Sequence, residues 1–243
     1  MKARLMFLTS LLVLTGCNTP ESSFAPGDEV SETNFNKAFA VREILLNSNY
    51  HVDITLNEYD IPSEEGHASY SKSIDFDGKK AKVLYTSNED PFYFDFSRTT
   101  GEEKYSFDFY SPYTYDSELY YSVEPHDNVT ISNGLLGIKD MIKVLGNKDL
   151  TLITGIIYSN FKFNNGIYEL KEPIKAEMGS AKATFDVIKV SFKGNTPKEV
   201  YYHMSVDYTF ETQVFTISMD SHLAFSKHGE VKVELPEVKE IGE

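Results

Sequence analysis

Strict alternation of apolar and polar residues along several segments is the strongest constraint that this sequence places on its fold. Residues 50–57 alternate without a break, and residues 200–208 repeat the pattern. A period of two places all the apolar side chains on one face of a strand. Strands with one apolar face are typical of antiparallel sheets that other elements cover on that face. The chain is therefore predicted to be mainly β.

Turn sequences divide the chain into about eleven predicted strands. Asp77-Gly78 and Asn164-Asn165-Gly166 have the composition that tight hairpin turns favour. Further turns are predicted at 194–197 and at His228-Gly229. The predicted strands cover residues 50–57, 70–76, 81–85, 92–97, 105–109, 115–123, 156–163, 167–170, 188–192, 200–208 and 215–223.

Two regions have the period of 3.6 that is typical of amphipathic helices. Asn34 is predicted to cap the first helix, which ends near Asn47. Ser132 or Asn133 is predicted to cap the second helix, which ends at Gly146. Residues 150–153 are a candidate for a third, short helix.

The number of helices is small for the number of strands, and this indicates how they are arranged. Long strands with one apolar face need a cover, and only the two or three predicted helices supply one. We therefore predict an α+β fold that is mainly β. A large curved antiparallel sheet, a half-barrel of about eleven strands, is covered on its concave face by two or three helices.

The N-terminal segment has the form of a secretory signal. Lys2 and Arg4 precede an apolar run at 5–14, which is shorter than the roughly 20 residues that a membrane-spanning helix needs. The run ends in Leu14-Thr15-Gly16-Cys17, which resembles the lipobox of bacterial lipoproteins. Two alternatives are a plain signal peptide with a chance cysteine and an uncleaved anchor.

The lipobox resemblance implies where the mature protein lies. Residues 1–16 would be removed, and Cys17 would carry two acyl chains, which anchor stably where a single chain holds only marginally. The protein would then be extracytoplasmic and lipid-anchored to a bacterial membrane, either the cell membrane or the outer membrane.

The domain boundaries follow from composition. Residues 18–33 are polar and contain proline and glycine, so 17–33 is predicted to be a lipidated cysteine followed by a disordered tether. The alternative is a loop packed on the domain. A single β-rich binding domain is predicted at 34–236, with a polar tail at 237–243.

Charge and cysteine content exclude some classes of protein. The chain has 37 acidic and 23 basic residues and a formal net charge of −14, so nucleic acid and anionic headgroups repel it. Nucleic-acid binding is therefore not predicted. Cys17 is the only cysteine, so the domain must fold without an internal disulfide.

No motif for catalysis or for a cofactor occurs, so no catalytic residue and no cofactor is predicted. His51 shares a predicted strand face with Asp53, and His203 shares one with Asp207; we interpret them as solvent-facing polar side chains and predict no metal site. Asp75-Phe76-Asp77-Gly78 resembles the start of a calcium loop but lacks the later ligands, so a turn is predicted there. The six histidines are His51, His67, His126, His203, His222 and His228.

Two other groups of residues are candidates for a site. The acidic pairs Glu64-Glu65 and Glu102-Glu103 are interpreted as solvated loop charges. The aromatic ladder at 92–121 is interpreted as part of the core, with sugar or lipid binding as the alternative.

The order of the predicted elements resembles that of a known superfamily. A helix leads into a meander of long strands, a helical insertion follows at 132–146, and hairpins lead to the ending at 225–236. This order is similar to that of the lipoprotein-localisation superfamily, the LolA/LolB-like half-barrels, over roughly residues 34–236. The resemblance implies a curved sheet with helices in its mouth and a function in binding acyl chains or lipidated peptides. It assigns no ligand-binding residue.

Two functions of different classes are consistent with these features. The first is a non-enzymatic domain that binds acyl chains or a lipidated or hydrophobic partner in an apolar cavity. The alternative is an envelope or surface interaction protein whose core is filled by its own side chains. A third hypothesis, an enzyme acting on polysaccharide or peptide, would require two converging carboxylates in a cleft.

The lipobox yields a direct test. We expect Cys17→Ser to leave the domain folded, because no disulfide is lost and Cys17 precedes the predicted domain. The same change should abolish incorporation of a clickable fatty acid and release the chain from the membrane fraction. Equal labelling of both proteins would show that the anchor lies elsewhere, and loss of folding would show that Cys17 is structural.

Overall fold

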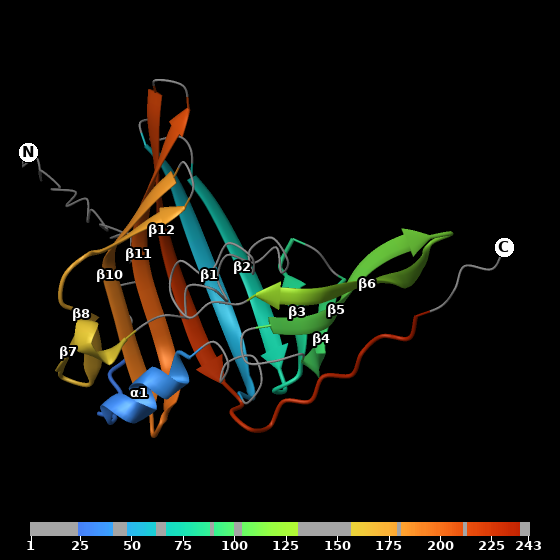
Figure 1. Cartoon of the computed structure of the whole chain (residues 1–243), viewed down its shortest axis with the longest axis horizontal. Helices are drawn as coiled ribbons and strands as arrows, with labels where there is room; N and C mark the ends of the chain where they lie inside the picture. Colours follow the sequence, from blue (N-terminus) through green and yellow to red (C-terminus); the bar gives the residue numbers. More distant parts are fainter. Residues whose placement is uncertain are drawn as a thin grey trace, which may run out of the picture.

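A single curved antiparallel sheet dominates the protein (Figure 1). The computed structural model describes residues 24–40, 48–61, 67–87, 90–99, 104–130, 157–178, 181–210 and 213–238. These ranges contain twelve strands in one open sheet and one α-helix. The predicted mainly β fold and curved half-barrel sheet are confirmed, with fewer helices than the prediction required.

The first and last strands of the chain are neighbours at the centre of the sheet. The order across the sheet is β6-β5-β4-β3-β2-β1-β12-β11-β10-β8-β7, and β9 pairs with β10 beside β8. The first six strands are β1 (Tyr50–Ile61), β2 (His67–Phe76), β3 (Lys80–Tyr85), β4 (Phe92–Thr99), β5 (Lys104–Tyr115) and β6 (Glu118–Thr130). The others are β7 (Phe161–Asn164), β8 (Ile167–Leu170), β9 (Ile174–Met178), β10 (Ala181–Lys193), β11 (Thr196–Phe210) and β12 (Gln213–Ser226).

The helical segments differ from the prediction in number and in their boundaries. The described ranges contain α1 (Glu32–Ala38) and the 3-10 turn η2 (Tyr158–Asn160). The predicted strand at 156–163 is therefore wrong at its start, since β7 begins only at Phe161. Three segments of the predicted helices lie outside the described ranges: residues 41–47, 132–146 and 150–153. No helix within those ranges has the length and hydrophobicity needed to cross a membrane.

Ser31 caps α1, so the predicted cap at Asn34 is wrong. The Ser31 hydroxyl accepts a hydrogen bond from the backbone N–H of Asn34 at 3.3 Å. This places Val30 immediately before the cap and Phe35 in the first turn, the two positions of a hydrophobic staple, and both side chains are buried. The helix begins there because that register directs its apolar residues at the sheet.

An aromatic cluster joins α1 to the sheet near β7, β8 and β10. The Phe35 ring is fully buried, and besides Phe39 four aromatic rings from other segments lie around it, with centroid distances between 5.0 and 5.5 Å. Aromatic pairs at this spacing contribute beyond the area they bury. The four rings belong to Tyr158, Phe161, Tyr168 and Phe192.

The segment before α1 lies against the sheet, so the predicted disordered tether is wrong for residues 24–33. Gly27 N donates to Gly166 O at 2.9 Å, and Asp28 N donates to Phe192 O at 2.9 Å. A Cβ on Gly27 would lie 2.1 Å from Phe192 O, so only glycine allows this approach. The alternative, a loop packed on the domain, describes this part of the chain, and residues 18–23 lie outside the described ranges.

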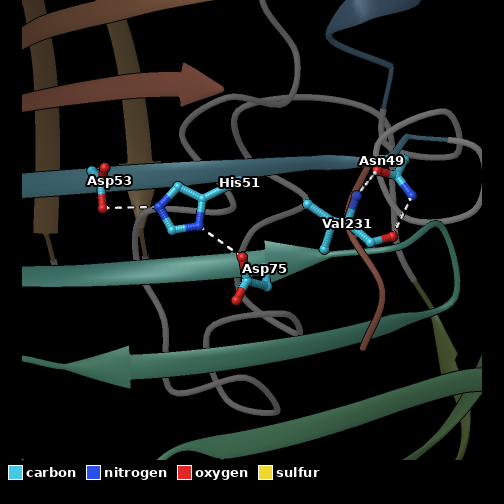
Figure 2. Close-up of polar contacts among 5 residues, drawn as sticks. All are labelled: Asn49, His51, Asp53, Asp75 and Val231. Atoms are coloured by element: carbon cyan, nitrogen blue, oxygen red, sulfur yellow. Dashed lines mark hydrogen bonds and ion pairs between the residues drawn. The ribbon is translucent and has the colours of Figure 1, made fainter. Parts of the chain in front are cut away.

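The C-terminal segment lies against the same end of the sheet, below β1 to β4 in the view of Figure 1. Asn49 Nδ2 donates to Val231 O and Asn49 Oδ1 accepts from Val231 N, both at 2.9 Å (Figure 2). Asp77 Oδ2 accepts from Val233 N at 3.2 Å. Val231 and Val233 are buried although they belong to no strand. We call this end, where β1 begins and β2 ends, the capped end of the sheet.

The hairpin turns follow the sequence closely, with one correction. Asp77-Gly78 and Asn165-Gly166 form the predicted turns, with positive φ at Gly78, Asn165 and Gly166. The strand predicted at 115–123 instead contains a turn at Asp116-Ser117, where φ is 48° and 64°. Positive φ at both central residues is the geometry of a type I′ hairpin turn, so the chain reverses inside the predicted strand.

The hairpin of β5 and β6 extends beyond its neighbour in the sheet. The last pair between β4 and β5 is Tyr93 with Tyr110, whereas β5 and β6 remain paired as far as Tyr115 and Glu118. Figure 1 shows this two-stranded extension projecting from the sheet. We call residues 111–122 the arm.

Tyr168 tests how firmly the N-terminal segment is held. Its hydroxyl accepts from Val30 N at 2.7 Å and donates to Val30 O at 2.9 Å, in a buried site. We expect Tyr168→Phe to lower the free energy of unfolding by about 1–3 kcal/mol, because two buried backbone groups lose their partner. Urea denaturation measures the change, and exchange of the Val30 amide hydrogen should become faster.

Tyr115→Phe is the matched control for Tyr168→Phe. Tyr115 is 49% exposed on the arm. Its loss of a hydroxyl should change the free energy of unfolding by less than about 0.5 kcal/mol. Equal effects of the two substitutions would contradict the role given to Tyr168.

Candidate functional site

On β1 to β5, the apolar face of the sheet is most deeply buried towards the capped end. One row of side chains across β1 to β5 is almost fully buried, with every member at most 2% exposed. Its members are Ile54, Ile74, Val83, Phe94 and Phe107. On each of these strands, the next residue of the same face away from the capped end is only partly buried. These residues form a second row that runs diagonally, since the register pairs Lys72 with Ile54, Phe92 with Val83 and Phe109 with Phe94. Its members are Leu56, Lys72, Tyr85, Phe92 and Phe109.

We call this second row the half-buried row, and its side chains lie close to one another from β2 to β5. The Lys72 ammonium lies 5.4 Å from the centroid of the Tyr85 ring, and the two residues are register partners. The ring centroids of Tyr85 and Phe92 are 6.0 Å apart, and those of Phe92 and Phe109 are 5.7 Å apart in parallel planes. The row is in register only between Lys72 and Tyr85, and it shifts by two residues along the strands at each of the next two steps.

The predicted aromatic ladder at 92–121 divides into core and exposed parts. The interpretation as core is correct for Phe94, Phe96 and Phe107, which are buried. On the arm, Tyr113 and Tyr120 stack at 5.8 Å, and Tyr115 is exposed. Alternation assigns the buried and the exposed part of the ladder to the same kind of strand. The period of a strand does not show where its neighbouring strands end.

Tyr121 belongs to the other face of the sheet. Its ring packs edge-on against Tyr93 at 5.6 Å, and the side chain is buried although β6 lies at the edge of the sheet. Burial, followed by the nearby Tyr93 and Asp90, raises the pKa of Tyr121 to about 12. The pair therefore stays neutral in the physiological range.

The polar face of the sheet holds the histidines as members of cross-strand contacts. His51 and Asp53 share a face as predicted, with His51 Nε2 3.1 Å from Asp53 Oδ1. His51 Nδ1 also lies 2.7 Å from Asp75 Oδ1 on β2 (Figure 2). Both ring nitrogens therefore face carboxylate oxygens, and the ring links two strands. Asp75 was missed as a partner because its position opposite His51 depends on the strand register.

His203 also shares a face with Asp207, but the structure gives each of them a different neighbour. Asp207 accepts a hydrogen bond from Thr216 Oγ1 at 2.7 Å, whereas His203 Nδ1 lies 3.9 Å from Asp220 Oδ1. Asp220 also accepts from the Tyr201 hydroxyl at 2.8 Å. The group ties β11 to β12 on the polar face.

The other residues considered as ligands do not converge on one point. His222 lies 3.3 Å from Glu199, His126 lies 3.8 Å from Glu124, and the His67 side chain lies outside the described part. Within the described ranges, no group of three or more His, Cys, Asp or Glu side chains is placed to hold a metal ion. The acidic pairs at 64–65 and 102–103 also lie outside these ranges.

The sequence that resembles a calcium loop forms the predicted turn. Asp77 Oδ1 accepts from Lys79 N at 3.1 Å and from Lys80 N at 2.8 Å, and Asp77 N donates to Lys80 O at 3.0 Å. Its carboxylate therefore holds the backbone of the turn from β2 to β3.

Comparison with known proteins gives distant likenesses in structure. No protein-family model and no curated protein sequence matches the chain. A LolA superfamily protein from Nitrosomonas europaea is 8% identical, with 86% of this chain and 96% of that chain covered and a TM-score of 0.29. An S-type phycobiliprotein lyase from Guillardia theta is also 8% identical, with coverage of 81% and 92% and a TM-score of 0.30.

A third likeness is to lipovitellin, in a structure that describes its lipid–protein interactions. It is 9% identical, with 79% of this chain and 26% of that chain covered and a TM-score of 0.31. The resemblance to LolA/LolB-like half-barrels thus has a counterpart among solved structures, but membership of that superfamily is not shown. At these identities and TM-scores, the three likenesses give no information about what this chain binds.

His228, at the capped end, makes the stability of the protein depend on pH. Its Nε2 lies 3.0 Å from Pro197 O, and its ring lies 6.4 Å from that of Tyr50. Burial lowers the pKa of His228, the hydrogen bond to Pro197 opposes this change, and Lys193 adds to it. The unfolded chain therefore binds a proton at a higher pH than the folded chain, and His228 lowers stability as the pH falls below about 6.5.

We expect His228→Gln to reduce the loss of stability on acidification. Wild type should lose more free energy of unfolding than His228→Gln between about pH 7.5 and about pH 5, because only wild type carries the histidine that takes up a proton on unfolding. Urea midpoints at the two pH values measure the difference. Equal losses in the two proteins would contradict the lowered pKa.

Proposed function

We propose that the protein is a bacterial lipoprotein, anchored outside the cytoplasm through lipid on Cys17, whose half-buried row binds a hydrophobic ligand. The ligand is an acyl chain or a lipidated partner. The gradient of burial along the apolar face is the observation that carries the proposal. Fully buried rows stabilise the fold, whereas large apolar side chains that stay partly accessible are the usual lining of a ligand site.

The position of the covering elements supports this division of the sheet. The segment from Phe24 to α1 and the segment around Val231 both lie at the capped end. Val30, Phe35 and Phe39 of the first segment belong to the hydrophobic core, and Val231 and Val233 of the second segment are buried. On each of β1 to β5, the residue of the half-buried row lies two positions farther from the capped end than the fully buried one.

The polar face supports binding as the mode of action. Each carboxylate described there lies against a strand neighbour: Asp75 against His51, Asp220 against Tyr201 and Asp207 against Thr216. A glycosidase would need two carboxylates at a set separation across a substrate cleft. Side chains that link strands in this way hold the sheet in shape around its apolar face.

The arm favours the alternative, an envelope protein that interacts with other proteins. Tyr115 and Leu119 are 49% and 43% exposed on this part of the hairpin, which projects from the sheet. Exposed apolar side chains on a projecting element are typical of a protein-binding surface. This alternative requires no ligand on the half-buried row, so one experiment separates the two.

Photo-crosslinking of the full chain in its membrane provides that experiment. Cells are fed a photoactivatable, clickable fatty acid and irradiated, and the labelled peptides are identified by mass spectrometry. We expect one set of labels at Cys17 and a second set on peptides of β1 to β5. Labels confined to the peptide of Cys17 would contradict ligand binding, and crosslinks from the arm to another protein would favour the alternative.

Phe92→Gln and Tyr93→Gln form a matched pair for the same measurement. The two residues are adjacent on β4, with Phe92 in the half-buried row and Tyr93 on the polar face beside Tyr121. Phe92→Gln places an amide in the apolar row, so labelling of β1 to β5 should fall by about tenfold, whereas Tyr93→Gln should leave it near the wild-type value. Equal labelling in both variants would contradict the site.

A further inference from the structure

Charged residues are distributed unevenly over the sheet. Residues 50–130, which contain β1 to β6, have 17 acidic and 6 basic residues. Residues 161–193, which contain β7 to β10, have 4 acidic residues and 6 lysines. In a chain with a formal net charge of −14, β7 to β10 are therefore the part of the sheet in which positive charge prevails.

Five of these lysines lie on the polar face of the sheet. Each lysine of β10 is next in sequence to a buried apolar residue and is therefore directed to the polar face. Register places one lysine of β9 and one of β7 on the same face, opposite Thr184 and Glu169. The acidic residues of these strands are Glu169, Glu177 and Asp186. We call this surface the lysine face; its lysines are Lys162, Lys175, Lys182, Lys189 and Lys193.

The first described residues of the chain also lie on the polar face. Ala25 N donates to Glu199 Oε2 at 3.3 Å, and the Phe24 ring lies 6.2 Å from the ring of His222. Glu199 on β11 and His222 on β12 are both next in sequence to a buried apolar residue, so both belong to this face.

This contact places the start of the domain beside the lysine face. Glu199 is the register partner of Ser191 on β10, and a lysine lies two residues from Ser191 on either side. Phe24 is seven residues after Cys17. Seven residues span at most about 25 Å, so a lipid on Cys17 keeps this part of the domain close to the bilayer.

Charge then determines which side of the anchored domain faces the bilayer. Anionic headgroups attract lysines that come within a Debye length, about 8 Å at physiological ionic strength. The same headgroups repel the acidic residues of β1 to β6. The chain as a whole is acidic and has no net attraction to such a surface, so the lipid holds it there while its charges orient it.

We propose that the lysine face docks on the anionic lipid headgroups of the membrane that holds Cys17, with β1 to β6 directed away from that surface. This inference rests on the lipid anchor of the proposed function and adds the orientation of the anchored domain. Because the half-buried row belongs to β1 to β5, it is then held away from the headgroups.

Two matched positions can report the orientation. Cys17 is the only cysteine and carries the lipid in the proposed function, so an introduced cysteine is the one free thiol. Thr184→Cys lies on the lysine face, opposite Lys175. Thr114→Cys is exposed on the arm, on β5. Each is labelled with the same uncharged fluorescent dye.

The experiment measures quenching of the dye by a nitroxide on a lipid headgroup. The lipidated full chain is reconstituted in phosphatidylcholine vesicles with and without phosphatidylglycerol, and both kinds contain the same nitroxide-labelled phosphatidylcholine. Flotation shows that the chain stays on the vesicles, and circular dichroism shows that each variant is folded.

Two pairs of substitutions test the lysines themselves. Lys175→Gln with Lys182→Gln removes two exposed charges from the lysine face. Lys79→Gln with Lys82→Gln is the control, because it removes two charges from the hairpin of β2 and β3. Each pair is combined with each reporter.

We expect quenching to depend on position, on lipid charge and on the lysine face. With phosphatidylglycerol, quenching at Thr184→Cys should exceed that at Thr114→Cys by about fivefold, because each lysine near an anionic surface favours docking several-fold. Removal of Lys175 and Lys182 should bring the two positions close together, and the control pair should leave the ratio unchanged. Salt at about 1 M, where the Debye length is about 3 Å, should also abolish the difference.

Three outcomes would overturn the inference. Equal quenching at the two positions with phosphatidylglycerol would leave the lysine face to an acidic partner other than lipid. A difference that persists in phosphatidylcholine alone would assign the orientation to the chain after Cys17 and not to charge. Equal effects of the two substitution pairs would remove the role of the lysine face. Loss of the chain from the floating vesicles would instead refute the lipid anchor of the proposed function, and the inference with it.

Discussion

The pairing of β1 with β12 is the interaction on which the rest of the structure depends. Its register runs from His51 opposite Ser226 to Ile61 opposite Thr216, along nearly the whole of β1. It joins the meander of β1 to β6 to the C-terminal strands, so that their apolar faces form one surface. The paired residues are between 155 and 175 positions apart, so bringing them together costs loop-closure entropy. The long ladder of hydrogen bonds offsets that cost.

Contacts at the capped end then divide the apolar surface into two parts. Tyr168 satisfies both backbone groups of Val30, and the Asn49 side chain does the same for Val231. Segments without strand or helix partners must find such hydrogen bonds before they can be buried, since an unpaired buried backbone group costs about 1–3 kcal/mol. On β1 to β5, the side chains nearest this end are the most completely buried, and the half-buried row lies farther along the same strands. One sheet can thus combine a stabilising core with a surface for a ligand.

The sequence predicts the strands well and the site poorly, for a physical reason. Alternation assigned Tyr50, Val52 and Ile54 to one face of β1, and glycine placed the turns at Gly78 and Gly166, because both signals are local. Lys72 carries no such signal: a lysine at one position of an alternating strand is indistinguishable from a solvent-exposed residue until its register partner Tyr85 is known. Asp75 beside His51, and the burial of Val30 against Tyr168, depend in the same way on pairing between distant segments. Ser31 is also a residue type that favours the N-cap position, but Asn34 favours it equally, so the sequence does not show which of the two caps the helix.

The edges of the sheet explain why it stays open and so leaves a row of side chains for binding. β7 and β8 are only four residues long, which limits what can pair with that edge. The other edge, β6, carries Pro125 and a positive φ at Asn128, and a bulge interrupts its pairing with β5. Arg98 on β4 binds both Asp108 on β5 and Asp127 on β6, which fixes the last strands to each other. These features oppose pairing of β6 with β7, the step that would close a barrel and bury Phe92 and Phe109 inside it.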